Sequence, residues 1–548
     1  MRSEAMADVL EVELSDLELL AETRRAVAAS KLGRAAILAE EGVRRGLVDP
    51  LLYAALGLKA QEDGRDGDAI EELTRSLALS PRNYVLLNAI GVSLVKLRRI
   101  QEGLAKFDEA ISLQPALAQS YFRKGWAYET LGDRNIAAHW YGQALRFAPN
   151  LAPALGALAG LAIRDGKSAQ ARELAEKALK SDPNESGAIL ALSRADLADG
   201  SYASAETRLK NALDRPGLPS QIRAVMLGFL GDALDGQDRI SEAFGAYQAS
   251  NALYRELYHR RFGGKSETVD FIERLRTDVE SMNFAQSRPS AAKSEARSHV
   301  FLMGFVRSGT TLLERVLLAS PDVVSLEERD TLQSLASRFL GSREALQRLA
   351  ALDPDEAEAA RSEYWDAVRA LGGKPDGKIF VDKQPLNTFT LPLIATIFPD
   401  AKILFALRDP RDVVLSCFRR HFEPGATTYD FLTLESAARY YAQAMRLAEA
   451  CREKFQLALL ECRYEDLVAD FEGTMRRVCR HIGTDWREEM RDFSELAKTT
   501  SIRSPSADQV RRPLYREGVG QWRRYGECLA PTLPTLAPWI EKFGYATT

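Results

Sequence analysis

Cysteine and histidine are scarce in this chain of 548 residues, which contains five of each. The cysteines are scattered beyond residue 416 without a Cys-x-x-Cys pair, and the histidines are far apart. Protein zinc sites need closely spaced Cys and His ligands, so we expect no metal site. An odd and dispersed set of cysteines favours reduced thiols, and hence a cytoplasmic protein, over a disulfide framework.

Long apolar runs and a strong net charge are also missing. No stretch of about 18 uninterrupted apolar residues occurs, so no membrane span is expected. The net charge of −4 argues against a generally basic nucleic-acid binder. Residues 1–20 are acidic and lack the apolar segment of a secretory signal. These absences again favour a cytoplasmic location.

The first half of the chain does contain a strong internal period. Prolines end similar segments at intervals of 34, 34, 34 and 33 residues, at Pro81, Pro115, Pro149, Pro183 and Pro216. Alanines keep the same spacing at Ala110, Ala144, Ala178 and Ala212, as do glycines at Gly57, Gly91 and Gly125. A 34-residue period with small residues inside and a terminal proline resembles the tetratricopeptide repeat, a pair of packed helices.

The repeats predict an α-solenoid over residues 1–260, with clear units at 51–217 and degenerate flanks. One unit cannot bury its apolar face alone, so neighbouring units must stack. We expect the resulting groove to bind a protein or peptide partner, although self-association is an alternative. Residues 261–297 read as a helical linker that ends in a small, polar stretch.

From residue 298 the pattern changes to strand, loop and helix. Apolar runs that end near Gly304, Lys383 and Leu407 are each followed by a turn and a helical pattern. Alternating strands and helices predict a parallel sheet of P-loop type over residues 298–548. Ligands bind at the carboxyl ends of such strands, where Arg307, Lys383 and Arg408 would converge as a polyanion site.

The stretch "GFVRSGTT" has the frame of a phosphate-binding loop, G-x-x-x-x-G, but Thr310 stands where the lysine belongs. The backbone N–H groups of such a loop bind an anion at a helix N-terminus. A nucleotide kinase or ATPase would need that lysine, so this class is disfavoured.

In "LRDPRDVVLS", Asp409 is a good N-cap residue. Arg408, Ser416 and Arg420 could converge there on one phosphate.

These motifs resemble those of sulfotransferases that use 3′-phosphoadenosine 5′-phosphosulfate (PAPS), and most closely the protein-tyrosine branch. "VRSGTTLLERVLLASPDVVSLEE", "VDKQP", "LRDPRDVVLS", "RYEDLV" and "SADQVRRP" occur in that branch's order. The resemblance covers residues 298–548. Together with the repeats, the chain resembles the repeat-containing bacterial sulfotransferases. The resemblance implies PAPS as co-substrate and no metal. It also implies a hydroxyl acceptor, which is a protein tyrosine, a carbohydrate or lipid, or a small metabolite.

The resemblance also implies site residues. The 5′ side of the donor is assigned to Arg307, Ser308, Gly309, Thr310 and Thr311. The 3′-phosphate is assigned to Arg408 and Ser416, with help from Arg420. Tyr464 and Ser506 match further donor contacts. Lys383 and Arg307 match the cations that stabilise the transferring group.

The acceptor needs a general base, and the resemblance places it at Glu328, with Glu327 and His421 as rivals. The chain departs from the protein-tyrosine branch at Arg329 and Asp330, which follow the paired glutamates. It departs again at Gln521, which stands where that branch has a lysine beside the tryptophan. Arg511, Arg512, Arg516 and Arg523 are candidate replacements. These departures leave the acceptor open. A repeat scaffold with a non-catalytic nucleotide-sensing domain is the alternative function.

Overall fold

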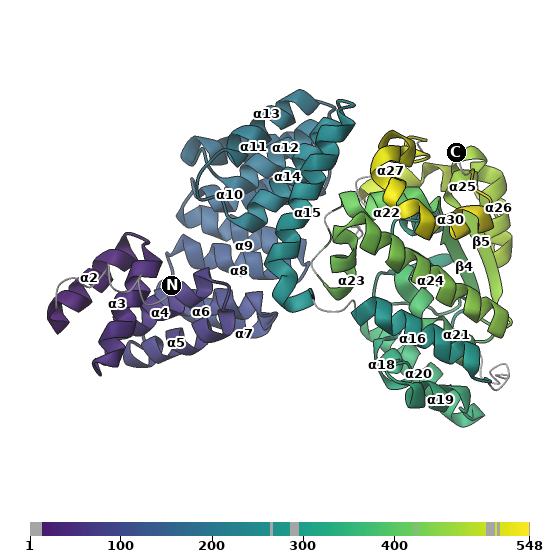
Figure 1. Cartoon of the computed structure of the whole chain (residues 1–548), viewed down its shortest axis with the longest axis horizontal. Helices are drawn as coiled ribbons and strands as arrows, with labels where there is room; N and C mark the ends of the chain where they lie inside the picture. The colour runs from purple at the N-terminus through teal and green to yellow at the C-terminus, as the bar shows by residue number, and fades with distance from the viewer. Residues whose placement is uncertain are drawn as a thin grey trace. The chain divides into compact units, whose positions relative to one another are not determined.

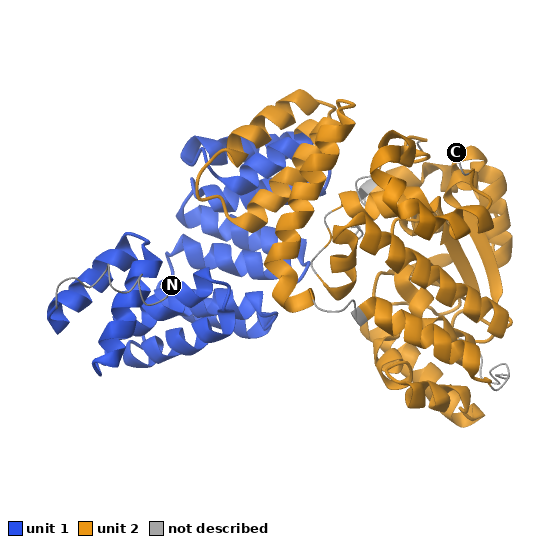
Figure 2. Ribbon diagram, viewed as in Figure 1, with its two compact units in different colours: residues 1–195 blue, residues 196–548 orange. Residues whose placement is uncertain are grey.

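The structure is a computed structural model, and it describes residues 14–263, 267–284, 295–420, 422, 425–499, 510–511, 514 and 516–546. The chain forms two compact units, residues 1–195 and 196–548, coloured separately in Figure 2. The division falls inside a helix of the repeat array, so the second unit contains the last repeat helices together with the α/β domain.

The first unit consists of antiparallel helix pairs, as the 34-residue period predicts (Figure 1). Its helices are α2 (Asp16–Ala28), α3 (Leu32–Arg44), α4 (Pro50–Glu62), α5 (Asp66–Leu79), α6 (Tyr84–Lys96), α7 (Ile100–Leu113), α8 (Ala118–Thr130), α9 (Arg134–Phe147), α10 (Ala152–Arg164), α11 (Ser168–Ser181) and most of α12 (Ser186–Ala198). Pro81, Pro115, Pro149 and Pro183 each lie two residues beyond the end of a helix.

Each periodic glycine makes room for a large side chain of the partner helix. A Cβ atom at Gly91 would lie 2.5 Å from the ring of Phe107, and one at Gly125 would lie 2.6 Å from the ring of Tyr141. Ala144, on the second helix of its pair, is fully buried. Small residues therefore let the paired helices approach closely, which explains why they recur with the period.

The second unit begins with α13 (Tyr202–Leu213), α14 (Ser220–Asp235) and α15 (Ile240–Phe262). The pair α14–α15 repeats the glycine relation, because a Cβ atom at Gly231 would lie 2.5 Å from Tyr247. In the segment predicted as a linker, α16 (Glu267–Ser281) packs against α24 (Leu434–Lys454) of the α/β domain. The polar stretch at 285–294 lies outside the described residues.

The α/β domain has a parallel five-stranded sheet with the order β2-β3-β1-β4-β5. The strands are β1 (Ser298–Gly304), β2 (Val323–Glu327), β3 (Ile379–Lys383), β4 (Lys402–Leu407) and β5 (Ala458–Arg463). The predicted fold class, a repeat solenoid followed by a parallel α/β domain, is confirmed. Strand β2 was not predicted, and it adds an edge strand whose register sets Glu327 beside Lys383.

Helices cover both faces of the sheet (Figure 1). They are α17 (Thr310–Leu317), α18 (Gln333–Phe339), α19 (Arg343–Ala350), α20 (Pro354–Ala370), α21 (Leu391–Ile397), α22 (Pro410–Arg419), α23 (Ala426–Tyr429), α25 (Tyr464–Ala469), α26 (Phe471–Ile482), α27 (Phe493–Thr499), α29 (Gly526–Leu529) and α30 (Leu533–Lys542), with 3₁₀ turns η1 (Pro385–Thr390), η2 (Asp430–Leu432), η3 (Glu488–Asp492), η4 (Gln521–Tyr525) and η5 (Ala530–Thr532). Fully buried Val300, Val381 and Leu404 centre the core on the sheet. Within the described ranges, no helix has the length and apolarity needed to cross a bilayer.

Candidate active site

The predicted phosphate loop connects β1 to α17. Gly304 ends the strand with φ 151°, where a Cβ atom would lie 2.3 Å from the carbonyl oxygen of Ala406 on β4. Gly309 is the N-cap of α17 and has the left-handed φ of 98°. Both glycines are required by the backbone path. The loop therefore presents the first N–H groups of α17, which have no intrahelical partner, at the carboxyl edge of the sheet.

The basic residues predicted to converge do lie at this edge. Arg307 follows β1, Lys383 ends β3 and Arg408 follows β4, and these three strands are neighbours. Nε of Arg307 donates to Oγ of Ser416 at 2.9 Å, and Nη1 of Arg408 donates to the carbonyl oxygen of Arg307 at 3.1 Å. The loop and the start of α22 are thereby joined. In the described part of the chain, the buried Nε of Arg408 has no hydrogen-bond partner.

Tyr464 and the C-terminal segment lie beside the loop. The Tyr464 ring lies 3.1 Å from the position of a Cβ atom at Gly309, and the Arg408 guanidinium lies 5.0 Å from its centroid. Arg408 also donates to the carbonyl oxygen of Gly518. Sequence reasoning found Tyr464 but missed Gly518, which only the fold brings back to the loop.

Lys383 forms the centre of a buried cluster of carboxylates. Its side chain is fully buried, and Nζ lies 2.7 Å from Oε1 of Glu328, 3.4 Å from Oε2 of Glu314 and 3.7 Å from Oε1 of Glu327. Burial by itself lowers the pKa of the Lys383 ammonium, but the three carboxylates together raise it above its ordinary value. Lys383 is therefore a protonated, positioned cation at neutral pH.

The two adjacent glutamates differ in their surroundings. Glu327 also accepts from Nη2 of Arg315 at 2.6 Å and its side chain is 12% exposed, whereas the Glu328 side chain is 25% exposed. Glu328 has the left-handed φ of 45°, and its N–H donates to the carbonyl oxygen of Lys383 at 2.8 Å. A non-glycine residue in this region costs about 1–2 kcal/mol and often marks a functional site.

A hydrogen-bonded chain supports β3 just before Lys383. Asp382 is fully buried and accepts from Thr331 Oγ1 at 2.6 Å and from the Tyr364 hydroxyl at 2.8 Å. Because Tyr364 donates to Asp382, it accepts from Nε2 of His299 at 2.9 Å, which fixes the tautomer of that histidine. Burial raises the pKa of Asp382 to about 6 and lowers that of His299 to about 3.

The other predicted residues fall into three groups. Ser308, Thr310 and Thr311 are buried where the loop enters α17. Nη1 of Arg420 lies 3.9 Å from Oδ2 of Asp232 on α14. The remaining group, outside the described residues, contains Ser506, His421 and Arg512.

Sequence reasoning missed two buried charges, Glu314 and Arg315, on α17. Their side chains are only 1% and 5% exposed. Glu314 accepts from Ser325 Oγ at 2.6 Å, and burial raises its pKa. Their only sequence signal was charge inside an otherwise apolar helix.

The fold and site define an α/β domain in which a glycine loop at the N-terminus of α17 lies near a buried lysine and a partly exposed carboxylate. No group of three or more His, Cys, Asp or Glu side chains that could hold a metal ion occurs among the residues described. This arrangement is typical of enzymes that bind a phosphorylated nucleotide and transfer a group from it.

Comparison with known families agrees with this class. Residues 299–488 match the sulfotransferase family, and residues 118–151 and 162–226 match tetratricopeptide repeats. The chain thus combines tetratricopeptide repeats with a C-terminal sulfotransferase-family domain. The resemblance that the motifs indicated is confirmed.

Relatives were found at low identity. An uncharacterized protein of Aquifex aeolicus is 24% identical over 61% of this chain and 44% of its own length. The protein-tyrosine sulfotransferase of Drosophila melanogaster is 26% identical over 45% of this chain and 51% of its own. Protein-tyrosine sulfotransferase 1 of Danio rerio is 27% identical over 45% and 72%. The chain therefore spans about half the length of the first two relatives. A tetratricopeptide-repeat protein of Thermus thermophilus is a structural neighbour at 22% identity over 31% of this chain and 92% of that one, with TM-score 0.28.

Proposed function

We propose that the protein transfers a sulfuryl group from PAPS to a hydroxyl acceptor. The observation that carries this proposal is the 2.7 Å contact between Lys383 Nζ and Glu328 Oε1, next to a phosphate loop without a lysine of its own. A cation and a partly exposed carboxylate at one point are what transfer to a hydroxyl requires. The sulfotransferase-family match of residues 299–488 supports the same chemistry.

The residues around the loop fit the two anionic ends of such a donor. Backbone N–H groups at the start of α17, with the hydroxyls of Thr310 and Thr311, suit the phosphosulfate. Arg408 and Ser416 suit the 3′-phosphate, and the unpartnered Nε of Arg408 leaves a buried donor available to it. Arg307 bonds to Ser416 and so stands between the two groups of residues. Tyr464 beside Gly309 suits a contact with the nucleotide.

The residues of the chain remove a proton from the acceptor and stabilise the negative charge that develops on the leaving group. The donor supplies an activated sulfuryl group: the acceptor oxygen forms a bond to sulfur as the bond from sulfur to the 5′-phosphate oxygen breaks. Glu328 accepts the proton of the acceptor hydroxyl. Lys383, with Arg307, offsets the negative charge that develops on the departing phosphate oxygen. The second product is adenosine 3′,5′-bisphosphate.

Glu328 suits the role of base better than Glu327. Glu327 contacts two cations, Arg315 at 2.6 Å and Lys383 at 3.7 Å, and it is the more buried of the two, so an acceptor has less access to its carboxylate. Glu328 is the more exposed, and an acceptor can reach it. Its left-handed φ of 45° is a strained conformation of the kind that clusters at active sites.

The acceptor that we favour is a protein or peptide hydroxyl, with tyrosine as the leading candidate. Two relatives are named protein-tyrosine sulfotransferases, and tetratricopeptide grooves commonly bind extended peptides. A glycan or lipid hydroxyl is the competing outcome. Transfer of labelled sulfate from PAPS into a lysate of the source organism, followed by identification of the product, separates these acceptors.

Turnover of labelled PAPS by Glu328→Gln tests the assignment, with Glu327→Gln as its matched neighbour. We expect Glu328→Gln to lower kcat about 100-fold or more, because general-base catalysis contributes about 10²–10⁴-fold. Glu327→Gln should stay within about fivefold of wild type, since on this account it supports Lys383 without touching the acceptor.

Both variants should retain wild-type affinity for adenosine 3′,5′-bisphosphate, which shows that the donor site is intact. Equal turnover by Glu328→Gln and wild type would remove Glu328 as the base. Absence of any PAPS turnover by the wild type in the presence of lysate acceptors would favour the scaffold alternative.

A further inference from the structure

Helix α22 connects two parts of the second unit. At its N-terminus, Asp409 caps the helix directly after Arg408, and Ser416 lies within it. At its C-terminus, Arg419 reaches α14 of the last repeat pair. The helix has 10 residues and is therefore about 15 Å long. A short regular helix moves as one body, so a displacement at Arg419 also displaces Ser416.

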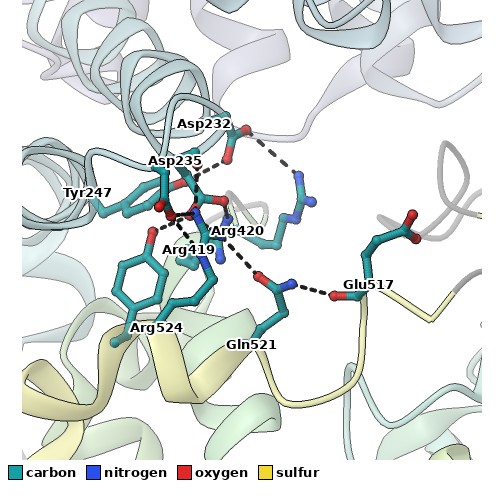
Figure 3. A network of polar contacts seen from close by, with 10 residues as sticks. Asp232, Asp235, Tyr247, Arg419, Arg420, Glu517, Gln521 and Arg524 are labelled. Atoms are coloured by element: carbon teal, nitrogen blue, oxygen red, sulfur yellow. Dashed lines mark hydrogen bonds and ion pairs between the residues drawn. The ribbon is translucent and has the colours of Figure 1, made fainter.

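Asp235, the last residue of α14, binds the C-terminal end of α22 (Figure 3). Its carboxylate pairs with Arg419, whose side chain is 15% exposed. The guanidinium of Arg419 also lies 5.3 Å from the centroid of the Tyr247 ring. Asn251 of α15 donates to the carbonyl oxygen of Phe418 at 3.0 Å. The last turn of α22 is thus held by both helices of the repeat pair.

The same carboxylate binds the C-terminal segment of the chain. Oδ1 of Asp235 accepts from Arg524 Nη1 at 2.8 Å (Figure 3). It also accepts from the Tyr525 hydroxyl at 2.7 Å. Earlier in this segment, Gly520 N–H and Trp522 N–H donate to Asp412 of α22 at 2.7 and 2.8 Å.

Two routes therefore lead from Asp235 to the donor site. One runs along α22 to Ser416 and Arg408. The other runs through Arg524 and Tyr525 to Gly518, whose carbonyl oxygen accepts from Arg408. Because Asp235 is 13% exposed and serves two buried or half-buried arginines, loss of its charge leaves those guanidinium groups to find new partners.

We propose that Asp235 is a positioning residue for the donor site, and that the last repeat pair is thereby an integral support of donor binding. The proposal rests on the proposed function, since it concerns affinity for the donor nucleotide. It assigns to the end of the repeat array a role in the reaction in addition to any binding of a partner.

The test compares Asp235→Asn with Asp238→Asn in the full chain. Asp238 also pairs with Arg524, at 2.9 Å, but its side chain is 83% exposed. Its φ of 60° suits asparagine. Affinity and stoichiometry for adenosine 3′,5′-bisphosphate are measured by calorimetry. Asp235→Asn should bind about tenfold more weakly at full stoichiometry, the size of a coupling carried through packed elements. Asp238→Asn should bind within twofold of wild type.

Tyr525→Phe provides a second variant should Asp235→Asn fail to fold, because it removes only one hydrogen bond to Asp235. It should raise KM for PAPS with little change in kcat, a split that a loss of folded protein would not produce. Wild-type affinity and full stoichiometry in Asp235→Asn, or an unchanged KM in Tyr525→Phe, would overturn the positioning role. A wild-type protein that binds no bisphosphate would instead overturn the proposed function.

Discussion

The repeat array and the α/β domain differ in how deeply both partners of an ion pair can be buried. In the array, Arg75 pairs with Glu71 on one helix while both side chains are more than half exposed. In the α/β domain, Lys383 and Glu314 pair with side-chain exposures of 0% and 1%. Exposed ion pairs contribute about 0–1 kcal/mol to stability. Burying a charge costs desolvation free energy, so a buried ion pair is weak evidence for stability. On the proposed function, the buried pairs around Lys383 mark where the chemistry takes place in the α/β domain.

The array depends instead on tight glycine contacts, which gives the largest expected effect on stability. Gly91→Leu should destabilise the array by about 3 kcal/mol, because the fully buried Phe107 ring lies where the new Cβ would be. Gly33→Leu is the matched control, since nothing lies within 4 Å of a Cβ there. It should be neutral or stabilising by about 0.5–1 kcal/mol. Urea midpoints by circular dichroism measure both variants. A Gly91→Leu protein as stable as Gly33→Leu would break the account of the repeat packing.

A smaller effect is expected from the buried titratable groups of the α/β domain, which make its free energy of unfolding depend on pH. Burial holds the pKa of His299 at about 3, below the ordinary histidine value of 6.5. A depressed pKa stabilises the fold above pH 6.5, and this stability is lost progressively as pH falls toward 3. Between pH 7 and 5 the loss from this group is about 2 kcal/mol.

His299→Gln keeps a donor toward Tyr364 and removes the titration. Its free energy of unfolding should therefore fall by about 2 kcal/mol less than that of wild type between pH 7 and 5. Asp382 has the opposite sign, because its pKa is raised to about 6 and its stabilisation is lost as pH rises. It is present in both proteins, so the comparison isolates His299. Parallel pH profiles for the two proteins would contradict the buried, neutral histidine.

The difference between the repeat array and the α/β domain also explains which features could be predicted from the sequence. The array was predicted well because small residues recur with the period, and Gly57, Gly91 and Gly125 each face a large side chain of the partner helix. The strands carrying Arg307, Lys383 and Arg408 were predicted because each is apolar and ends in a turn. Strand β2 was not, since its five residues form a short edge strand with mixed burial. That omission hid how Glu328 reaches Lys383.

Contacts between distant residues were beyond sequence reasoning. Asp235 and Arg524 are 289 residues apart and belong to different sequence patterns, a repeat helix and a C-terminal turn. The burial of Glu314 and Arg315 was not predicted, because the pattern of a single helix cannot reveal what β2 and β3 bring against it. The donor role of Arg420 remains a prediction, and the structure places its guanidinium near Asp232.

The central claim is that the loop without a lysine serves a sulfuryl donor and not a triphosphate with magnesium. Thermal shift of the full chain with adenosine 3′,5′-bisphosphate, and separately with ATP and Mg²⁺, tests it most directly. A ligand at about 100 times its Kd stabilises the folded state by about 2.7 kcal/mol. We predict a clear rise in Tm with the bisphosphate and little change with ATP and Mg²⁺. Stabilisation by ATP and Mg²⁺, with none by the bisphosphate, would contradict the account.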